Sequence, residues 1–197
     1  MSNKEIQEQR MKGYFIQATK EILKGEGLKS ISVRNISERA GYSYATLYNY
    51  FKDVKDLIFE CVVDFQDECE TFIKSETKKY EPGLIKIKAI TKAYIKYFIQ
   101  YPGIYELFYI EKTTDLAHKQ PTVKLIHNFL NKLCEEEWQY CLNNKILNSA
   151  EASVMKETLH YAVIGALIIY INRRQPATYK EFSIIVESQL NYILNLA

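Results

Sequence analysis

Apolar residues recur every three or four positions along nearly all of this chain of 197 residues. That spacing matches the 3.6-residue turn of an α-helix, and no useful length of sequence alternates as a half-buried strand does. Seven glycines and four prolines are too few for a turn-rich β sandwich or barrel. Where they occur, they interrupt the periodic pattern and separate its segments. The sequence therefore predicts an all-α fold of about nine helices.

The first 52 residues contain a compact three-helix pattern. Met11, Phe15, Ala18 and Ile22 share one face of a first helix that stops near Gly25. Two short amphipathic helices follow within residues 32–51. A glycine-bearing turn joins them, which is the arrangement of a helix-turn-helix.

Each short helix begins with a serine that can cap it, Ser32 or Ser43, and Gly41 ends the first of the two. The positions that face inward are Val33, Ile36, Ala40, Leu47 and Phe51. The positions left to face outward on the second helix are Tyr44, Ala45, Thr46, Tyr48, Asn49 and Tyr50. None of these six is acidic, which suits a surface that approaches phosphates.

The stretch from Ser32 to Leu57 resembles the DNA-binding domain of the tetracycline-repressor (TetR) family of bacterial regulators. The residues that carry the resemblance are Ile36-x-x-x-Ala40-Gly41-x-Ser43-x-x-Thr46-Leu47-Tyr48-x-Tyr50-Phe51. It implies an N-terminal three-helix DNA-binding domain over residues 1–52 and a larger helical effector-binding and dimerisation domain over residues 53–197. It further implies a cytoplasmic homodimer that binds a palindromic double-stranded DNA operator and is released by a small effector. Repression is the expected role, although the sequence leaves activation open.

The resemblance and the chemistry of the side chains together predict the DNA contacts. An arginine can bind guanine or phosphate bidentately, a threonine can offer both a hydroxyl and a methyl group, and tyrosine hydroxyls can position the helix on phosphates. The family often has a lysine at the position of Val54, and here Lys52 or Lys55 is the candidate substitute. The predicted DNA-binding residues are Arg34, Ser43, Tyr44, Ala45, Thr46, Tyr48, Asn49, Tyr50, Lys52 and Lys55.

Aromatic residues crowd positions 94–109. An aromatic stripe at helical spacing indicates a large core, whereas the resemblance favours the wall of a pocket for an apolar or aromatic effector. Both interpretations stay open at this point. The candidate effector residues are Tyr94, Phe98, Tyr101, Tyr105, Phe108, Trp138 and Tyr161.

The last two helices are expected at about residues 150–172 and 178–196. The first of them is apolar almost all round, and Gly165 would allow another backbone to approach closely. It is either a buried core helix or, as the resemblance implies, part of a four-helix bundle between two copies of the chain.

Composition limits the remaining classes. The net charge of +2 neither demands nor excludes nucleic acid, and residues 1–10 lack the apolar core of a signal peptide. The longest apolar run, residues 161–171, falls short of the roughly 20 residues of a membrane span, so no membrane partner is expected. The sequence contains no cofactor, metal or catalytic-triad pattern, so neither a cofactor nor enzyme activity is expected. The rivals are a small all-α enzyme and a ligand-sequestering or interaction protein whose helix-turn-helix is non-functional.

Overall fold

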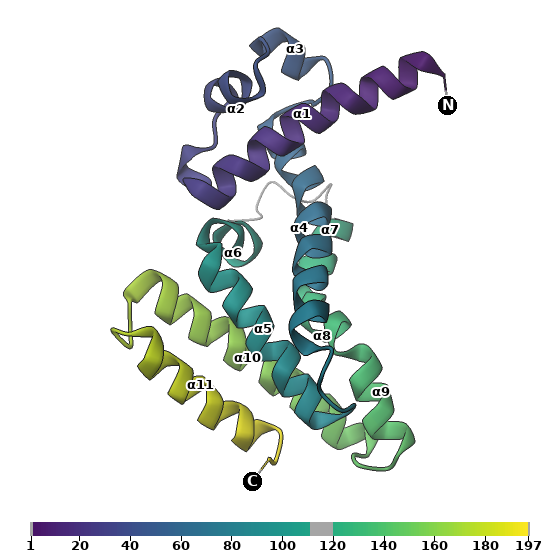
Figure 1. Cartoon of the computed structure of the whole chain (residues 1–197), viewed down its shortest axis with the longest axis vertical. Coiled ribbons are helices and arrows are strands. Elements are labelled where there is room, and N and C mark those ends of the chain that lie inside the picture. The colour runs from purple at the N-terminus through teal and green to yellow at the C-terminus, as the bar shows by residue number, and fades with distance from the viewer. Residues whose placement is uncertain (1, 111–119, 197) are drawn as a thin grey trace. The chain divides into compact units, whose positions relative to one another are not determined.

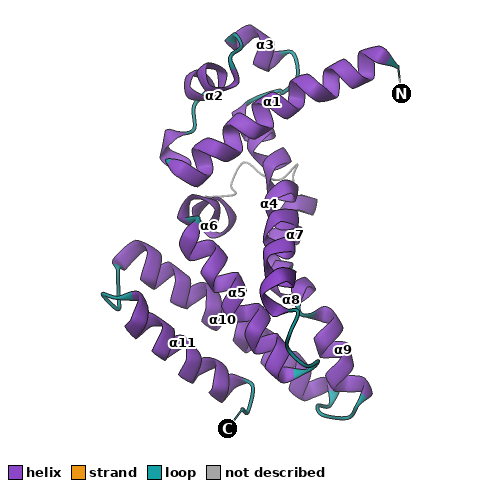
Figure 2. Cartoon of the chain, in the orientation of Figure 1, coloured by secondary structure: helices purple, strands orange, loops and turns teal. Residues whose placement is uncertain are grey.

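The structure is a computed structural model that describes residues 2–110 and 120–196, with the backbone alone at residues 120–123. Within those ranges every regular element is helical (Figure 2), which confirms the predicted all-α class. The elements, labelled in Figure 1, are α1 (Asn3–Gly25), η1 (Leu28–Ser30), α2 (Val33–Ala40), α3 (Tyr44–Tyr48), α4 (Val54–Thr77), α5 (Leu84–Gln100), α6 (Pro102–Tyr109), α7 (Gln120–His127), α8 (Phe129–Leu133), α9 (Glu135–Asn143), α10 (Ser149–Arg173) and α11 (Tyr179–Ile193).

Contacts divide the chain into two compact units. The N-terminal unit comprises residues 1–68 and 101–123, and the C-terminal unit comprises residues 69–100 and 124–197. These boundaries differ from the division expected at residue 52, because the first turns of α4 pack into the N-terminal core through Leu57. Residue 52 remains a prediction about where the DNA-binding function ends.

The core of the N-terminal unit joins α1, α2, α3 and the start of α4. Its buried members are Phe15, Ala18, Ile22, Ile36, Leu47, Phe51 and Leu57, with Met11, Val33 and Ala40 partly buried against them. All nine residues predicted to face inward from the first three helices belong to this cluster. Ion pairs from Lys20 to Asp64 (3.0 Å) and Glu68 (2.6 Å) join α1 to α4 beside it.

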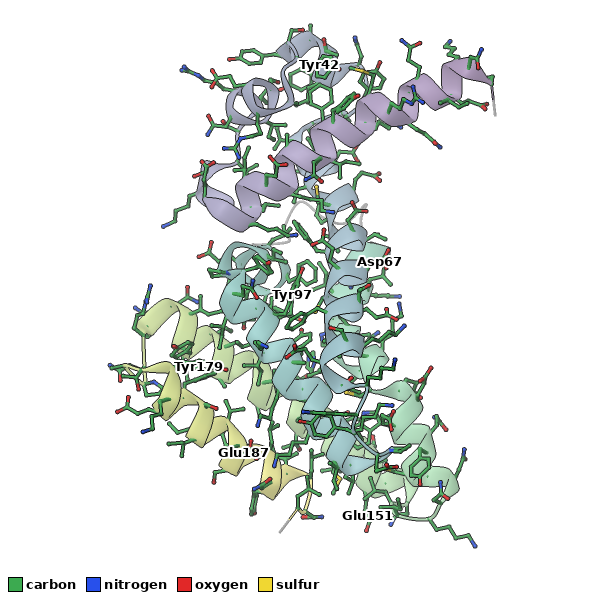
Figure 3. All side chains as sticks on the ribbon, in the orientation of Figure 1. Tyr42, Asp67, Tyr97, Glu151, Tyr179 and Glu187 are labelled. Carbon is green, nitrogen blue, oxygen red and sulfur yellow. The ribbon has the colours of Figure 1, made fainter. Side chains whose placement is uncertain are left out.

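The C-terminal unit packs α5 against α8, α9 and α10, and α10 against α11. Tyr94, Phe98, Phe129 and Trp138 are fully buried in it. Glu187 of α11, labelled in Figure 3, pairs with two lysines of α5, Lys88 and Lys92.

One predicted helix is divided in the structure. The sequence predicts a single helix from Pro121 toward Asn143, whereas the chain forms α7, α8 and α9 there, and the total rises to eleven helices within the described residues. At Asn128 and Cys134 the backbone opens to ψ 2° and 0°. These bends let Phe129 and Trp138 both turn into the core.

The helix α10 is longer than its uninterrupted apolar run. It has 25 residues and contains an 18-residue window with a mean hydropathy of 1.4. Length and composition alone would therefore allow it to cross a membrane, whereas the shorter run at residues 161–171 led us to expect no span. Polar residues break the run without lowering the average enough to exclude a span. Only 28% of that window is buried within the described structure, so α10 presents apolar surface that this chain does not cover.

Gly103 provides a test of how α6 sits on α1. A Cβ there would overlap the carbonyl oxygen of Leu23 and lie 2.8 Å from Cα of Gly27, so Gly103→Ala should lower the free energy of unfolding by about 1–3 kcal/mol. Gly13 within α1 has open space around it, and Gly13→Ala should instead raise the free energy by about 0.5–1 kcal/mol. Urea unfolding of both variants measures these changes. Wild-type stability in Gly103→Ala would contradict the close contact.

Candidate functional site

The starts of the short helices α2 and α3 and the end of α2 agree with the sequence prediction. Ser32 Oγ accepts a hydrogen bond from the backbone N–H of Asn35 (3.1 Å), and Ser43 Oγ accepts one from Thr46 (3.2 Å). Gly41 ends α2 with φ at 77°, a left-handed conformation that strains other residues. Because both ends of the turn are fixed by local chemistry, the orientation of α3 follows from the sequence around it.

The outward face of α3 is smaller than expected. The helix ends at Tyr48, so Asn49 and Tyr50 lie in the turn that follows it. Tyr44 and Tyr48 are about half exposed, at 49% and 53%, and Ala45 and Asn49 are also exposed. Tyr50 is only partly exposed. Four of the six predicted positions are thus exposed.

The other two outward positions have partners within the unit. Thr46 Oγ1 lies 2.9 Å from Ser43 Oγ, so its hydroxyl is already hydrogen-bonded. The ring of Tyr50 lies with its centroid 6.5 Å from that of Phe15. Both side chains hold α3 in place as well as bordering its surface.

Phe15 connects the helix-turn-helix to α1. Its ring centroid lies 5.7 Å from Tyr42 and 6.3 Å from Phe51, on either side of α3 in the chain. Tyr42 is labelled in Figure 3, and its ring centroid also lies 5.7 Å from that of Tyr14. Its side chain is 37% exposed. Sequence reasoning did not single out Tyr14 as a site residue, whereas Tyr42 occupies the turn itself.

The basic residues of the N-terminal unit have different surroundings. Arg34 has a side chain 74% exposed and pairs with Glu38 one turn along α2. Lys52 and Lys55 are exposed on either side of Val54, the first residue of α4. Exposure alone therefore favours neither lysine as the substitute for the family lysine.

The candidate effector residues fall into two groups. Tyr101, Tyr105 and Phe108 belong to the N-terminal unit, whereas Tyr94, Phe98, Trp138 and Tyr161 belong to the C-terminal unit. Five of the seven are buried, Tyr101 is partly exposed, and Tyr161 is 64% exposed. Burial raises the pKa of Tyr105, so its hydroxyl stays protonated. Tyr161 therefore lies on a surface, and the other six are core or near-core positions.

Two cavities of the C-terminal unit are lined by other residues. One, of about 130 Å³, lies between the end of α4, the start of α5 and α8–α9, and its rim carries three lysines and three glutamates. The other, of about 550 Å³, is an open apolar groove where Val154 and Met155 of α10 face Tyr192 and Ile193 of α11. Neither includes the aromatic candidates.

The cysteine thiols of the described residues are unreactive, and these residues form no candidate metal site. Cys61, Cys69, Cys134 and Cys141 are free and buried. Burial raises the pKa of the Cys61 and Cys134 thiols to about 12, so they remain protonated at neutral pH. No group of three or more potential metal ligands occurs in this part of the chain.

Residues 15–61 match a family model described as bacterial regulatory proteins, tetR family. The match covers α1 from Phe15 onward, the helix-turn-helix and the start of α4. No curated protein sequence matches the chain.

Solved structures share the fold over nearly the whole chain. FadR, a transcriptional regulator from Bacillus subtilis solved with stearoyl-CoA, matches with a TM-score of 0.73 at 12% identity, over 94% of this chain and 98% of that one. A putative tetR-family regulator from Mesorhizobium loti matches with a TM-score of 0.71 at 16% identity, over 96% and 97%. The fatty acid degradation regulator FadR from Bacillus halodurans matches with a TM-score of 0.66 at 14% identity, over 93% and 94%. Residues 15–61 thus resemble the tetR family of bacterial regulatory proteins, and the chain as a whole shares the fold of these solved regulators.

Proposed function

We propose that this protein is a homodimeric, cytoplasmic repressor that binds a palindromic DNA operator through α2 and α3 and is released by a small apolar or aromatic effector. The observation that carries the proposal is the face formed by Arg34, Tyr44, Ala45, Tyr48 and Asn49. These side chains are exposed, and α3 carries no carboxylate. Buried contacts fix the inner sides of both helices, so the face is preorganised for a groove.

The roles of these residues follow from their chemistry. Arg34 is the candidate base reader, because a guanidinium can bind guanine O6 and N7 together. Tyr44 opens the helix that enters the groove. The phenols of Tyr48 and Tyr50 position α3 on phosphates without adding charge, so binding should weaken only modestly with salt. Ala45 and Asn49 belong to the same face, and Ser43 and Thr46 border it.

Selection of random duplexes by the purified protein tests DNA binding. We expect an enriched palindrome whose half-sites lie about one helical turn, or a multiple of it, apart. Arg34→Ala should relax the base preference at one position of each half-site, whereas Tyr50→Phe should weaken binding equally on all sequences. Failure to enrich any site at low salt would favour the rival ligand-sequestering protein. A change of preferred site in Tyr50→Phe would contradict the division between reading and positioning residues.

The exposed apolar side chains of α10 and α11 support the homodimer. Val154, Tyr161, Ile184 and Tyr192 are exposed by 62% to 86% although they are large and apolar. Figure 1 shows the two helices side by side, and they are in contact. A second copy of the same surface would cover these side chains and form a four-helix bundle, which explains the apolar surface of α10 better than a membrane does.

An aspartate on this surface should separate the two copies. Ile184→Asp places a charge where the proposed interface excludes water, so we expect monomers at micromolar concentration in analytical ultracentrifugation. Val63→Asp is the matched control, because Val63 is an exposed β-branched residue (49%) in the part of α4 that belongs to the other unit. An Ile184→Asp variant that stays dimeric, or a wild-type protein that is monomeric, would contradict the proposed interface.

An apolar or aromatic effector is supported by the fold shared with FadR, which was solved with stearoyl-CoA. We propose that effector binding favours a spacing of the two α3 helices that no longer fits the operator. Linkage then requires effector and operator to weaken each other's binding by the same factor.

Stearoyl-CoA is the first probe of this mechanism. Calorimetry should detect binding of stearoyl-CoA to the free protein. Stearoyl-CoA should lower the affinity for the operator by the same factor by which bound operator lowers the affinity for stearoyl-CoA. Palmitate and an aromatic acid of similar size are the comparison probes. A ligand that binds without changing operator affinity would contradict the population-shift mechanism while leaving DNA binding intact.

A further inference from the structure

The two arginines of α2 are held in different ways. Arg39 donates from its terminal nitrogen Nη2 to Glu26, and its other terminal nitrogen lies 3.9 Å from Glu21 of α1. Both terminal nitrogens of the Arg39 guanidinium therefore face carboxylates at or beyond the end of α1. Arg34 instead donates from Nε to Glu38 Oε1 at 2.9 Å. Only one edge of the Arg34 guanidinium is used by the protein.

The edge of Arg34 that the protein leaves unused has the shape of a nucleic-acid reading group. Among the described residues, its terminal nitrogens Nη1 and Nη2 have no hydrogen-bond partner. A guanidinium held at Nε keeps these two donors side by side and directed away from the carboxylate. That parallel pair matches the two acceptors O6 and N7 of guanine.

The Arg34–Glu38 pair lies on α2, the helix that packs against α3. Both side chains are exposed, at 74% and 59%, on the face of α2 opposite the buried Ile36 and Ser37. The hydrogen bond to Glu38 raises the pKa of Arg34, and the nearby hydroxyl of Tyr44 raises it further. Since Tyr44 is the first residue of α3, the pair borders the proposed reading surface.

We propose that Glu38 is a positioning residue that holds the Arg34 guanidinium in one orientation and so sets base selectivity. The proposal rests on the proposed DNA-binding function. An arginine without this partner would sample several rotamers and could bind phosphates as well as a base. The Glu38 carboxylate also repels nearby phosphates, so it lowers affinity for every sequence while raising the preference for the correct base.

The two effects of Glu38 separate in a pair of substitutions. Glu38→Gln removes the charge and keeps an oxygen that can accept from Nε, whereas Glu38→Ala removes both. We expect both variants to bind a random duplex more tightly than the wild type, by about two- to tenfold at low salt. A bidentate contact gives a preference of roughly 5- to 150-fold for the correct base. We expect this preference at the base read by Arg34 to fall by about threefold or more in Glu38→Ala and by less in Glu38→Gln.

The measurement uses full-length protein and the operator selected by the wild type, with each base of one half-site replaced in turn. Dissociation constants for these duplexes and for a random duplex give selectivity and overall affinity separately. Glu26→Ala is the matched control, because it removes one carboxylate from the other arginine of α2 and should leave base discrimination unchanged. Arg34→Ala and the double variant Arg34→Ala/Glu38→Ala should show the same discrimination, since Glu38 acts through Arg34.

The outcomes are distinct. Tighter binding with unchanged discrimination in Glu38→Ala would reduce Glu38 to a repelling charge and overturn the proposal. Equal weakening on every duplex together with a lower melting temperature would assign it a structural role and also overturn it. A wild-type protein that selects no DNA site would overturn the proposed function, and this inference with it.

Discussion

The N-terminal unit depends on the packing of Phe15. This one ring is fully buried and contacts Tyr42 before α3 and both Tyr50 and Phe51 after it. A helix of five residues has too little internal hydrogen bonding to persist alone, so its position must come from such contacts. The exposed face that we propose for DNA is the side of α3 that this packing leaves uncovered.

Local chemistry explains why much of this unit could be predicted from the sequence. The serine caps, the glycine at positive φ and the inward faces depend on residues within about one turn of each other, and the structure confirms them. Contacts between distant residues carry no such signal. The ion pairs of Lys20 with Asp64 and Glu68 join residues more than forty apart, and Tyr14 meets Tyr42 only after α1 and the turn have packed.

The C-terminal unit was harder to predict for a related reason. Periodicity assigns Tyr94 and Phe98 to a buried face correctly, but it does not say which helices meet there. It also missed the bends at Asn128 and Cys134, where no glycine or proline stands. Tyr161 was grouped with the core aromatics by residue type, yet it is exposed with the apolar face of α10.

The burial of Trp138 has a practical consequence for following the two units separately. It is the sole tryptophan of the chain and belongs to the C-terminal unit, where it is fully shielded from water and has the Lys156 ammonium 5.9 Å from its ring. Tyrosine is the only strong fluorophore in the N-terminal unit, including the half-exposed Tyr44 and Tyr48 of α3. Selective excitation of tryptophan thus reports on the C-terminal unit alone, and the chain needs no added label to distinguish loosening of one unit from loosening of the other.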